Sequence, residues 1–270
     1  MGKSAKTRQA SARERIASQR AAQRRKEARR RLLMGIGSVG AVVAVVVALV
    51  LVKLTSPSVV AQPAQTDANV AAEATSVPDS VFDAVGNGGA TAPKAVSGLP
   101  ELTSGGKPEI LYMGGKFCPY CAAERWALAA ALSRFGTLTG LSFIHSAPDD
   151  GDIATMTFES AKYTSKYLTF TPVEWFGEAA DPSTPFGHVY FQHPTSAEVA
   201  LFNKYAGGGI PFIDVGNRYI VGSQFVPTDL SGMTWAQIAA AMHDPSSQVG
   251  KDIDGAANEI TAAIRALIKS

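Results

Sequence analysis

The chain has 270 residues, which is long enough for one sizeable folded domain with additional segments, and its average composition is that of a globular protein. It contains only two cysteines, so a zinc site with four cysteine ligands is excluded. The net charge of +2 hides an uneven distribution, because residues 1–31 carry twelve Lys and Arg against two Glu. This gives the N-terminal tail a net charge of +10 and the remaining 239 residues a net charge of −8.

An uncharged run over residues 32–52, rich in Val, Leu and Ala, separates the basic tail from the acidic body. About 20 helical residues span the hydrocarbon core of a bilayer, so we expect a single transmembrane helix over residues 32–54. A cleaved signal peptide would have a shorter apolar region, of about 7–15 residues, and a cleavage site directly after it. We therefore favour an uncleaved anchor that places residues 1–31 in the cytoplasm and the rest outside the cell membrane.

The basic tail itself permits two interpretations. Nucleic-acid binding would need the same positive charges, but this tail adjoins an apolar span and contains no aromatic residue. The charges are thus better explained as a topology signal beside anionic lipid. We expect the lipid bilayer to be the partner of residues 32–54, and we expect no nucleic acid.

Residues 55–76 contain mainly Ala, Ser, Pro, Gln, Thr and Val without periodicity, which is typical of a flexible linker. The folded, extracytoplasmic domain is expected to begin at residue 77 and to continue to residue 270. The short apolar segment 81–85 is its first candidate element.

The folded body begins with a strand, a helix and a second strand. Residues 109–113 form an apolar run typical of a buried strand, and a helix apolar on most sides follows from about Cys118. Residues 141–144 are predicted to be the next strand. This order indicates an α/β domain with a parallel core, joined by a right-handed crossover.

The second half of the body gives a clear pattern only after residue 207. Residues 147–206 mix turn, strand and weak helix signals. Pro211 stands at the entry to an apolar strand, where it loses no ladder hydrogen bond, and residues 210–222 read as a hairpin through Gly216 and Asn217. Helices are expected over residues 234–242 and 253–268.

The two cysteines are Cys118 and Cys121, at the predicted start of the first helix of the body. Unpaired backbone N–H groups at a helix start stabilise an anion, so Cys118 is expected to have an accessible sulfur and a lowered thiol pKa. Pro119 suits the first helical turn, since its missing N–H costs nothing there. Cys121, one turn later, is close enough to attack a mixed disulfide on Cys118. This spacing predicts thiol–disulfide exchange.

Two other uses of the cysteine pair are possible. A metal site would need further ligands from histidines or carboxylates, and none has a ligand-like spacing. We therefore expect no metal. A structural disulfide across so short a loop would remove little entropy from the unfolded chain.

The motifs CPYC and Gly-Ile-Pro-Phe, with the order of elements around them, resemble the thioredoxin superfamily. The string GGKFCPYCAAERWALAAALSRFG is similar to a membrane-anchored branch, the domain of unknown function 929 family, whose activity is not established. The resemblance implies a thioredoxin-like three-layer α/β sandwich over about residues 77–268, with an insertion near residues 147–206, preceded here by the single transmembrane helix.

The same resemblance implies roles for individual residues. Cys118 would be the attacking thiol, Cys121 the resolving thiol, and Pro211 a cis-proline facing them. Pro119, Tyr120 and Ile210 would support the site. Ile210 replaces the usual Thr or Val, and Tyr112 stands where the best-known members have a buried acid, so no carboxylate proton shuttle is expected at that position.

These inferences predict a membrane-anchored, extracytoplasmic thiol–disulfide oxidoreductase. It would act without a cofactor on exported protein thiols or disulfides, and a quinone-linked membrane protein would recharge it. The alternatives are a non-catalytic binding or assembly module of the cell envelope, and a thiol carrier in metal or haem maturation.

Overall fold

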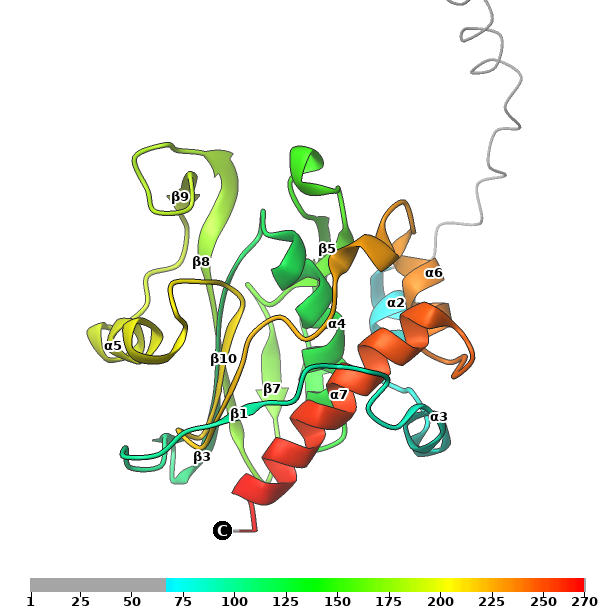
Figure 1. Cartoon of the computed structure of the whole chain (residues 1–270), viewed down its shortest axis with the longest axis horizontal. Coiled ribbons are helices and arrows are strands. Elements are labelled where there is room, and N and C mark those ends of the chain that lie inside the picture. Colours follow the sequence, from blue (N-terminus) through cyan, green and yellow to red (C-terminus); the bar gives the residue numbers. More distant parts are fainter. Residues whose placement is uncertain (1–66, 270) are drawn as a thin grey trace, which may run out of the picture. The chain divides into compact units, whose positions relative to one another are not determined.

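The computed structural model describes residues 67–269. These residues form a mixed α/β unit with six α-helices and one large mixed sheet (Figure 1). The predicted transmembrane helix over residues 32–54 lies outside the described residues. Within residues 67–269, no helix combines the length and the apolar character needed to cross a bilayer.

The elements follow one another from α2 to α7. The helices are α2 (Asp67–Ala74), α3 (Asp79–Val85), α4 (Pro119–Ser133), α5 (Ser196–Tyr205), α6 (Trp235–Ala241) and α7 (Gln248–Leu267), with short 3-10 turns η1 (Pro148–Asp150) and η2 (Pro227–Leu230). The strands are β1 (Lys94–Ala95), β2 (Thr103–Ser104), β3 (Lys107–Gly115), β4 (Thr137–Thr139), β5 (Ser142–His145), β6 (Ala154–Thr157), β7 (Lys162–Thr164), β8 (Thr169–Ala180), β9 (His188–Tyr190), β10 (Phe212–Val215) and β11 (Tyr219–Val221).

The large sheet has the strand order β1-β11-β10-β3-β8-β9, with β2 paired to the start of β3. Strand β3 lies inside it, parallel to β8 and antiparallel to β10. The predicted hairpin of β10 and β11 is confirmed. Strand β3 is thus paired on both edges, which fixes the position of the segment that follows it.

Helices cover both faces of this sheet. Successive side chains of a strand point to opposite faces; accordingly, Ile110 and Tyr112 of β3 pack with α4 and α7, whereas Leu111 and Met113 pack with Phe202 of α5. Figure 1 shows α4 and α7 on one side of the sheet and α5 on the other. The sheet is therefore the middle of three layers.

The parallel partner of β3 differs from our expectation. The predicted second strand, residues 141–144, corresponds to β5, which pairs with β6 in a separate two-stranded sheet. The parallel partner is β8, which lies within the segment interpreted as an insertion. The longer β8 offers twelve residues for pairing and buries Val173 and Phe176, whereas β5 has four residues and none of them is fully buried.

The start of the folded unit also differs. Residues 67–74, assigned to the predicted linker over residues 55–76, form helix α2. Val70 and Ala74 of this helix are buried in the main core. These few apolar contacts order a segment whose composition alone resembles a linker.

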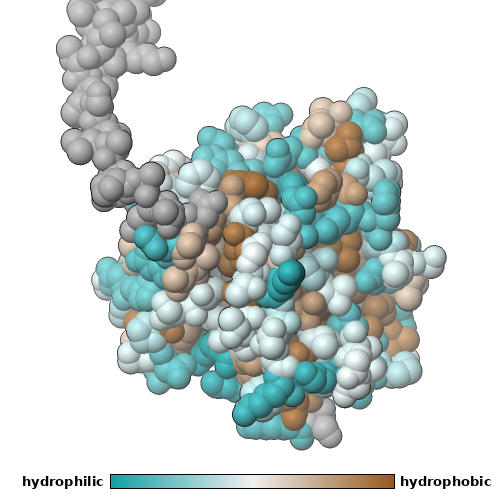
Figure 2. Space-filling model, turned by 180° about the vertical axis from the view of Figure 1, so that it is seen from behind, coloured by the Kyte–Doolittle hydropathy of each residue, from teal (hydrophilic) through white to brown (hydrophobic). Residues whose placement is uncertain are grey.

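The surface shown in Figure 2 carries hydrophobic residues in several separate groups among hydrophilic ones. Most of the large apolar side chains lie inside instead, where Trp126, Phe82, Phe158 and Phe212 are all buried. The packed core therefore supplies most of the apolar burial that stabilises the unit.

Two buried carboxyl groups predict how the stability of the fold depends on pH. Burial raises the pKa of Glu124 on α4 and of Asp254 on α7 to about 8 each. A carboxyl group whose folded-state pKa is raised stabilises the fold below its unfolded pKa, and this contribution is lost as the pH rises through the folded value. We expect the free energy of unfolding to fall between about pH 4 and pH 8.

The variant Glu124→Gln tests this dependence, because the amide oxygen can still accept the backbone hydrogen bond from Gln224. Urea unfolding should give a shallower fall with pH than in the wild type, with a gain on the order of a few kcal/mol above about pH 8. Glu178→Gln, at an exposed side chain, is the control and should leave the profile unchanged. Identical profiles for wild type and Glu124→Gln would contradict the assignment.

Candidate active site

The dithiol lies where β3 ends and α4 begins. Cys118 is the N-cap of α4, and Pro119 is its first residue, as the sequence predicts. Two backbone hydrogen bonds hold the turn between β3 and α4. The N–H of Lys116 donates to the carbonyl oxygen of Phe176 in β8 at 2.9 Å, and the N–H of Cys118 donates to the carbonyl oxygen of Gly115 at 3.3 Å. The first cysteine thus stands at the carboxyl end of a strand held on both edges.

The two cysteines are free thiols that interact with each other. The Cys118 sulfur accepts a hydrogen bond from the backbone N–H of Cys121 at 3.2 Å. Its interaction with the Cys121 thiol lowers the pKa of Cys118, and the helix-start N–H groups and the charge of Arg125 act in the same direction against the effect of burial. Burial raises the pKa of Cys121 well above its usual value, and the neighbouring Cys118 adds to this. The pair is polarised, with the thiolate favoured on Cys118.

Cys118 is less accessible than expected. Only 5 % of the residue is exposed, since it packs in a small apolar cluster with Phe117, Ala147 and Phe176. Two of these neighbours come from the segment between residues 147 and 206, whose path the sequence did not predict. The adjacent Tyr120, in contrast, is 45 % exposed and marks the open side of the turn.

Ile210 and Pro211 lie opposite the dithiol. The Cys118 thiol donates to the carbonyl oxygen of Ile210 at 3.8 Å, although 92 positions separate the two residues in the chain. The peptide bond between Ile210 and Pro211 is cis, and Pro211 directly precedes β10. The structure brings Cys118, Cys121 and Ile210 together where β3 ends and β10 begins.

A pocket of about 490 Å³ opens beside Phe117, the residue before Cys118. The Phe117 ring stacks on the imidazole of His188, with centroids 3.7 Å apart and planes at 6°, and its carbonyl oxygen accepts from the N–H of Ala147 at 2.8 Å. Both His188 and Ala147 line the pocket. Its other polar walls come from His145, Ser146, Asp149, Asp152 and Glu178.

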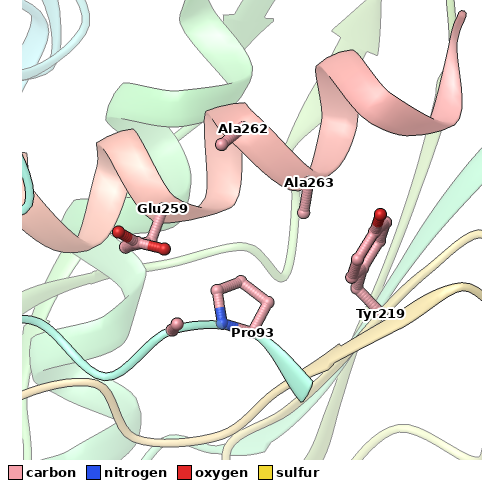
Figure 3. Close-up of a pocket in the computed structure, with 6 residues that line it drawn as sticks. Pro93, Tyr219, Glu259, Ala262 and Ala263 are labelled. Atoms are coloured by element: carbon pink, nitrogen blue, oxygen red, sulfur yellow. The ribbon is translucent and has the colours of Figure 1, made fainter. Parts of the chain in front are cut away.

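A smaller pocket of about 210 Å³ lies between α7 and the segment that precedes β1. Figure 3 shows Glu259, Ala262 and Ala263 of α7 facing Pro93 and Tyr219 across it. Tyr219 pairs with Val215, which in turn pairs with Ile110 near the start of β3. This pocket is therefore at the end of the sheet opposite the dithiol.

Beneath the dithiol lies a buried charged pair that the sequence analysis missed. Arg125 of α4 and Glu174 of β8 both have fully buried side chains and form a two-pronged ion pair, with Nε–Oε1 and Nη2–Oε2 distances of 3.0 and 2.7 Å. Adjacent Glu124 and Arg125 in an otherwise apolar helix were the available signal for it. Tyr112 of β3 is also fully buried, and its ring centroid lies 5.9 Å from the guanidinium carbon of Arg125.

Comparison with known proteins gives a family match over part of the chain. Residues 95–179 match a family described as Domain of unknown function (DUF929). The match supports the resemblance to that family, and the matched segment contains Cys118, Cys121, Arg125 and Glu174 but not Pro211. No curated protein and no solved structure matched the chain.

Proposed function

We propose that the unit of residues 67–269 is a thioredoxin-like domain that catalyses thiol–disulfide exchange. The observation that carries this proposal is the polarised dithiol, in which Cys118 accepts the N–H of Cys121 at a helix start and has a lowered pKa. The parallel pair of β3 and β8, the antiparallel β10 and β11, and Pro211 before β10 support a thioredoxin-like arrangement.

The proposed reaction has two steps. The Cys118 thiolate attacks one sulfur of a partner disulfide, so that a mixed disulfide forms and the partner's second sulfur leaves as a thiolate. Cys121 then attacks the Cys118 sulfur, which forms the Cys118–Cys121 disulfide and releases the partner's first sulfur. The partner gains two electrons and the dithiol loses two. Running backwards, the same steps oxidise a partner dithiol.

The partner is proposed to be an exported protein with an extended segment near its cysteine. Ile210 and the exposed Tyr120 border the dithiol, and a backbone beside a strand entry is suited to pairing with an extended chain. Partly exposed aromatic side chains around the same cluster, Trp175 and Phe186, offer apolar contact. Selectivity would then depend on the residues beside the reacting cysteine.

Residues 32–54 are proposed to anchor this domain to the cell membrane, with the N-terminus in the cytoplasm and the dithiol outside. The charge of +10 in residues 1–31, directly before an uncharged run, supports this orientation. An oxidising compartment favours an oxidase or isomerase that a quinone-linked membrane protein recharges.

Catalysis can be tested with the full-length chain in detergent micelles. We expect it to accelerate insulin reduction by dithiothreitol or oxidative refolding of a reduced secreted protein, and we expect Cys118→Ser to remove the acceleration. Full activity of Cys118→Ser would overturn the enzymatic proposal and favour a non-catalytic binding module.

A further inference from the structure

Arg125 is a cation in the interior of the unit. Its side chain has no exposed surface, and isolated buried charges are costly, so it must be held by specific partners. Glu174 supplies the two-pronged contact, and the Gly115 carbonyl oxygen accepts a third hydrogen bond from Nη2 at 2.8 Å. The guanidinium therefore has a fixed position.

The guanidinium lies beside the cysteines, on the interior side of the turn that carries them. Arg125 follows Cys121 by four residues in α4, so both side chains lie on one face of the helix, and helical side chains lean toward the N-terminus. The Gly115 carbonyl that binds Arg125 also accepts the N–H of Cys118 at 3.3 Å. One backbone oxygen thus links the guanidinium to the turn that carries the dithiol.

The hydrogen bonding of the ion pair is unequal. The Glu174 carboxylate also accepts from the Thr157 hydroxyl at 3.1 Å and the Phe158 N–H at 2.9 Å, so it has four donors in all. Nη1 of Arg125, in contrast, is buried without a hydrogen-bond partner among the residues that the structure describes. The carboxylate is fully satisfied, whereas the guanidinium retains a donor that a nearby anion would satisfy.

Cys121 is the group beside Arg125 that becomes an anion during exchange. It is fully buried, and burial raises its pKa, which opposes formation of the thiolate that must attack the mixed disulfide. The charge of Arg125 acts against this rise. Cys118 is the other ionisable group that acts on Cys121, and it raises the pKa of Cys121 further. Tyr112, whose pKa is raised by burial, interacts with the same groups, since Arg125 lowers its pKa whereas Glu174 and both cysteines raise it.

We propose that Arg125 is a positioning residue of the exchange reaction, whose guanidinium, held by Glu174 and Gly115, stabilises the thiolate of Cys121 as it attacks the mixed disulfide on Cys118. The proposal rests on the exchange activity proposed above. In this step the Cys121 proton leaves to solvent, the Cys118–Cys121 bond forms, and the bond to the partner breaks with release of the partner's thiolate.

The thiolate can be titrated without any substrate. In a Cys118→Ser background Cys121 is the only thiol of the full-length chain, and its ionisation is followed by ultraviolet thiolate absorbance. The reference carries Glu174→Gln, and the test variant adds Arg125→Met, so that no buried carboxylate is left unpaired. We expect the added change to raise the titration midpoint by at least about one pH unit, a tenfold loss of thiolate near neutral pH.

Two controls separate charge from packing. Arg125→Lys in the same background keeps the positive charge and should hold the midpoint close to that of the reference, although it cannot form the two-pronged contact. Arg134→Met removes another arginine, nine positions after Arg125, which corresponds to a rise of about 13 Å along the helix. This variant should leave the midpoint unchanged. Equal midpoints with and without Arg125 would overturn the inference.

The resolving step gives a second readout. A small aromatic thiol from Ellman's reagent is loaded on Cys118 of the chain with both cysteines, and its release reports attack by Cys121. Glu174→Gln with Arg125→Met should slow release about tenfold near neutral pH relative to Glu174→Gln alone. If these shifts appear but the wild type fails to turn over protein substrates, the role of Arg125 stands and the proposed function fails. If release is unchanged while the wild type turns over protein substrates, the proposed function stands and the role of Arg125 fails.

Discussion

Replacing Arg125 with methionine while Glu174 is retained should destabilise the fold by about 3–5 kcal/mol. The side chains of both residues are fully buried, and the remaining carboxylate would lose two of its four hydrogen-bond donors together with its counter-charge. The loss arises from the unpaired Glu174, so a second change, Glu174→Gln, should recover most of it. Urea unfolding of the single and double variants measures both effects.

A more exposed ion pair provides the control for this prediction. Lys116 Nζ lies 2.7 Å from Glu159 Oε2, and the two side chains are 14 % and 39 % exposed, respectively. Exposed ion pairs contribute about 1 kcal/mol or less, so Lys116→Met should have a small effect. A similar loss for Lys116→Met and Arg125→Met, or no recovery in the double variant, would contradict the view that the buried charge dominates.

Cells that express Cys121→Ser should accumulate mixed disulfides on Cys118. The substitution removes the sulfur that releases the partner, while Cys118 keeps its place at the helix start and its hydrogen bond from the backbone N–H of residue 121. On non-reducing gels, we expect higher-mass species that disappear on reduction and are several-fold more abundant than with the wild type. The species should be absent from the double variant Cys118→Ser/Cys121→Ser.

The outcome of this experiment distinguishes a cysteine pair that exchanges with partner disulfides from one that does not. If Cys121→Ser forms no adducts under conditions in which Cys118 can be alkylated by a small reagent, Cys118 does not attack partner disulfides. The small reagent is needed because only 5 % of the Cys118 residue is exposed.

The parts of the site that depend on neighbouring residues in the chain could be predicted from the sequence. Cys118 at a helix start and Pro119 in its first turn follow from local backbone chemistry, and the hairpin after Pro211 follows from Gly216 and Asn217 at its turn. Each signal lies within a few residues of the feature that it predicts.

The parts that depend on distant residues could not. The ion pair joins Arg125 to Glu174 across 49 positions, and no local rule indicates which strand faces a helical arginine. The same limit explains the misassigned parallel partner, since β5 is nearer in the chain but β8 buries more. The cover over Cys118 also comes from distant segments, through Ala147 and Phe176.

The reduction potential of the Cys118–Cys121 pair tests the central claim most directly. Full-length protein is equilibrated with graded glutathione or dithiothreitol buffers, and its free thiols are counted by alkylation and mass spectrometry. A catalytic dithiol with its thiolate stabilised on Cys118 should give one reversible two-electron transition between about −270 and −120 mV. A potential below about −300 mV, typical of structural disulfides, or two thiols that never pair, would contradict the account.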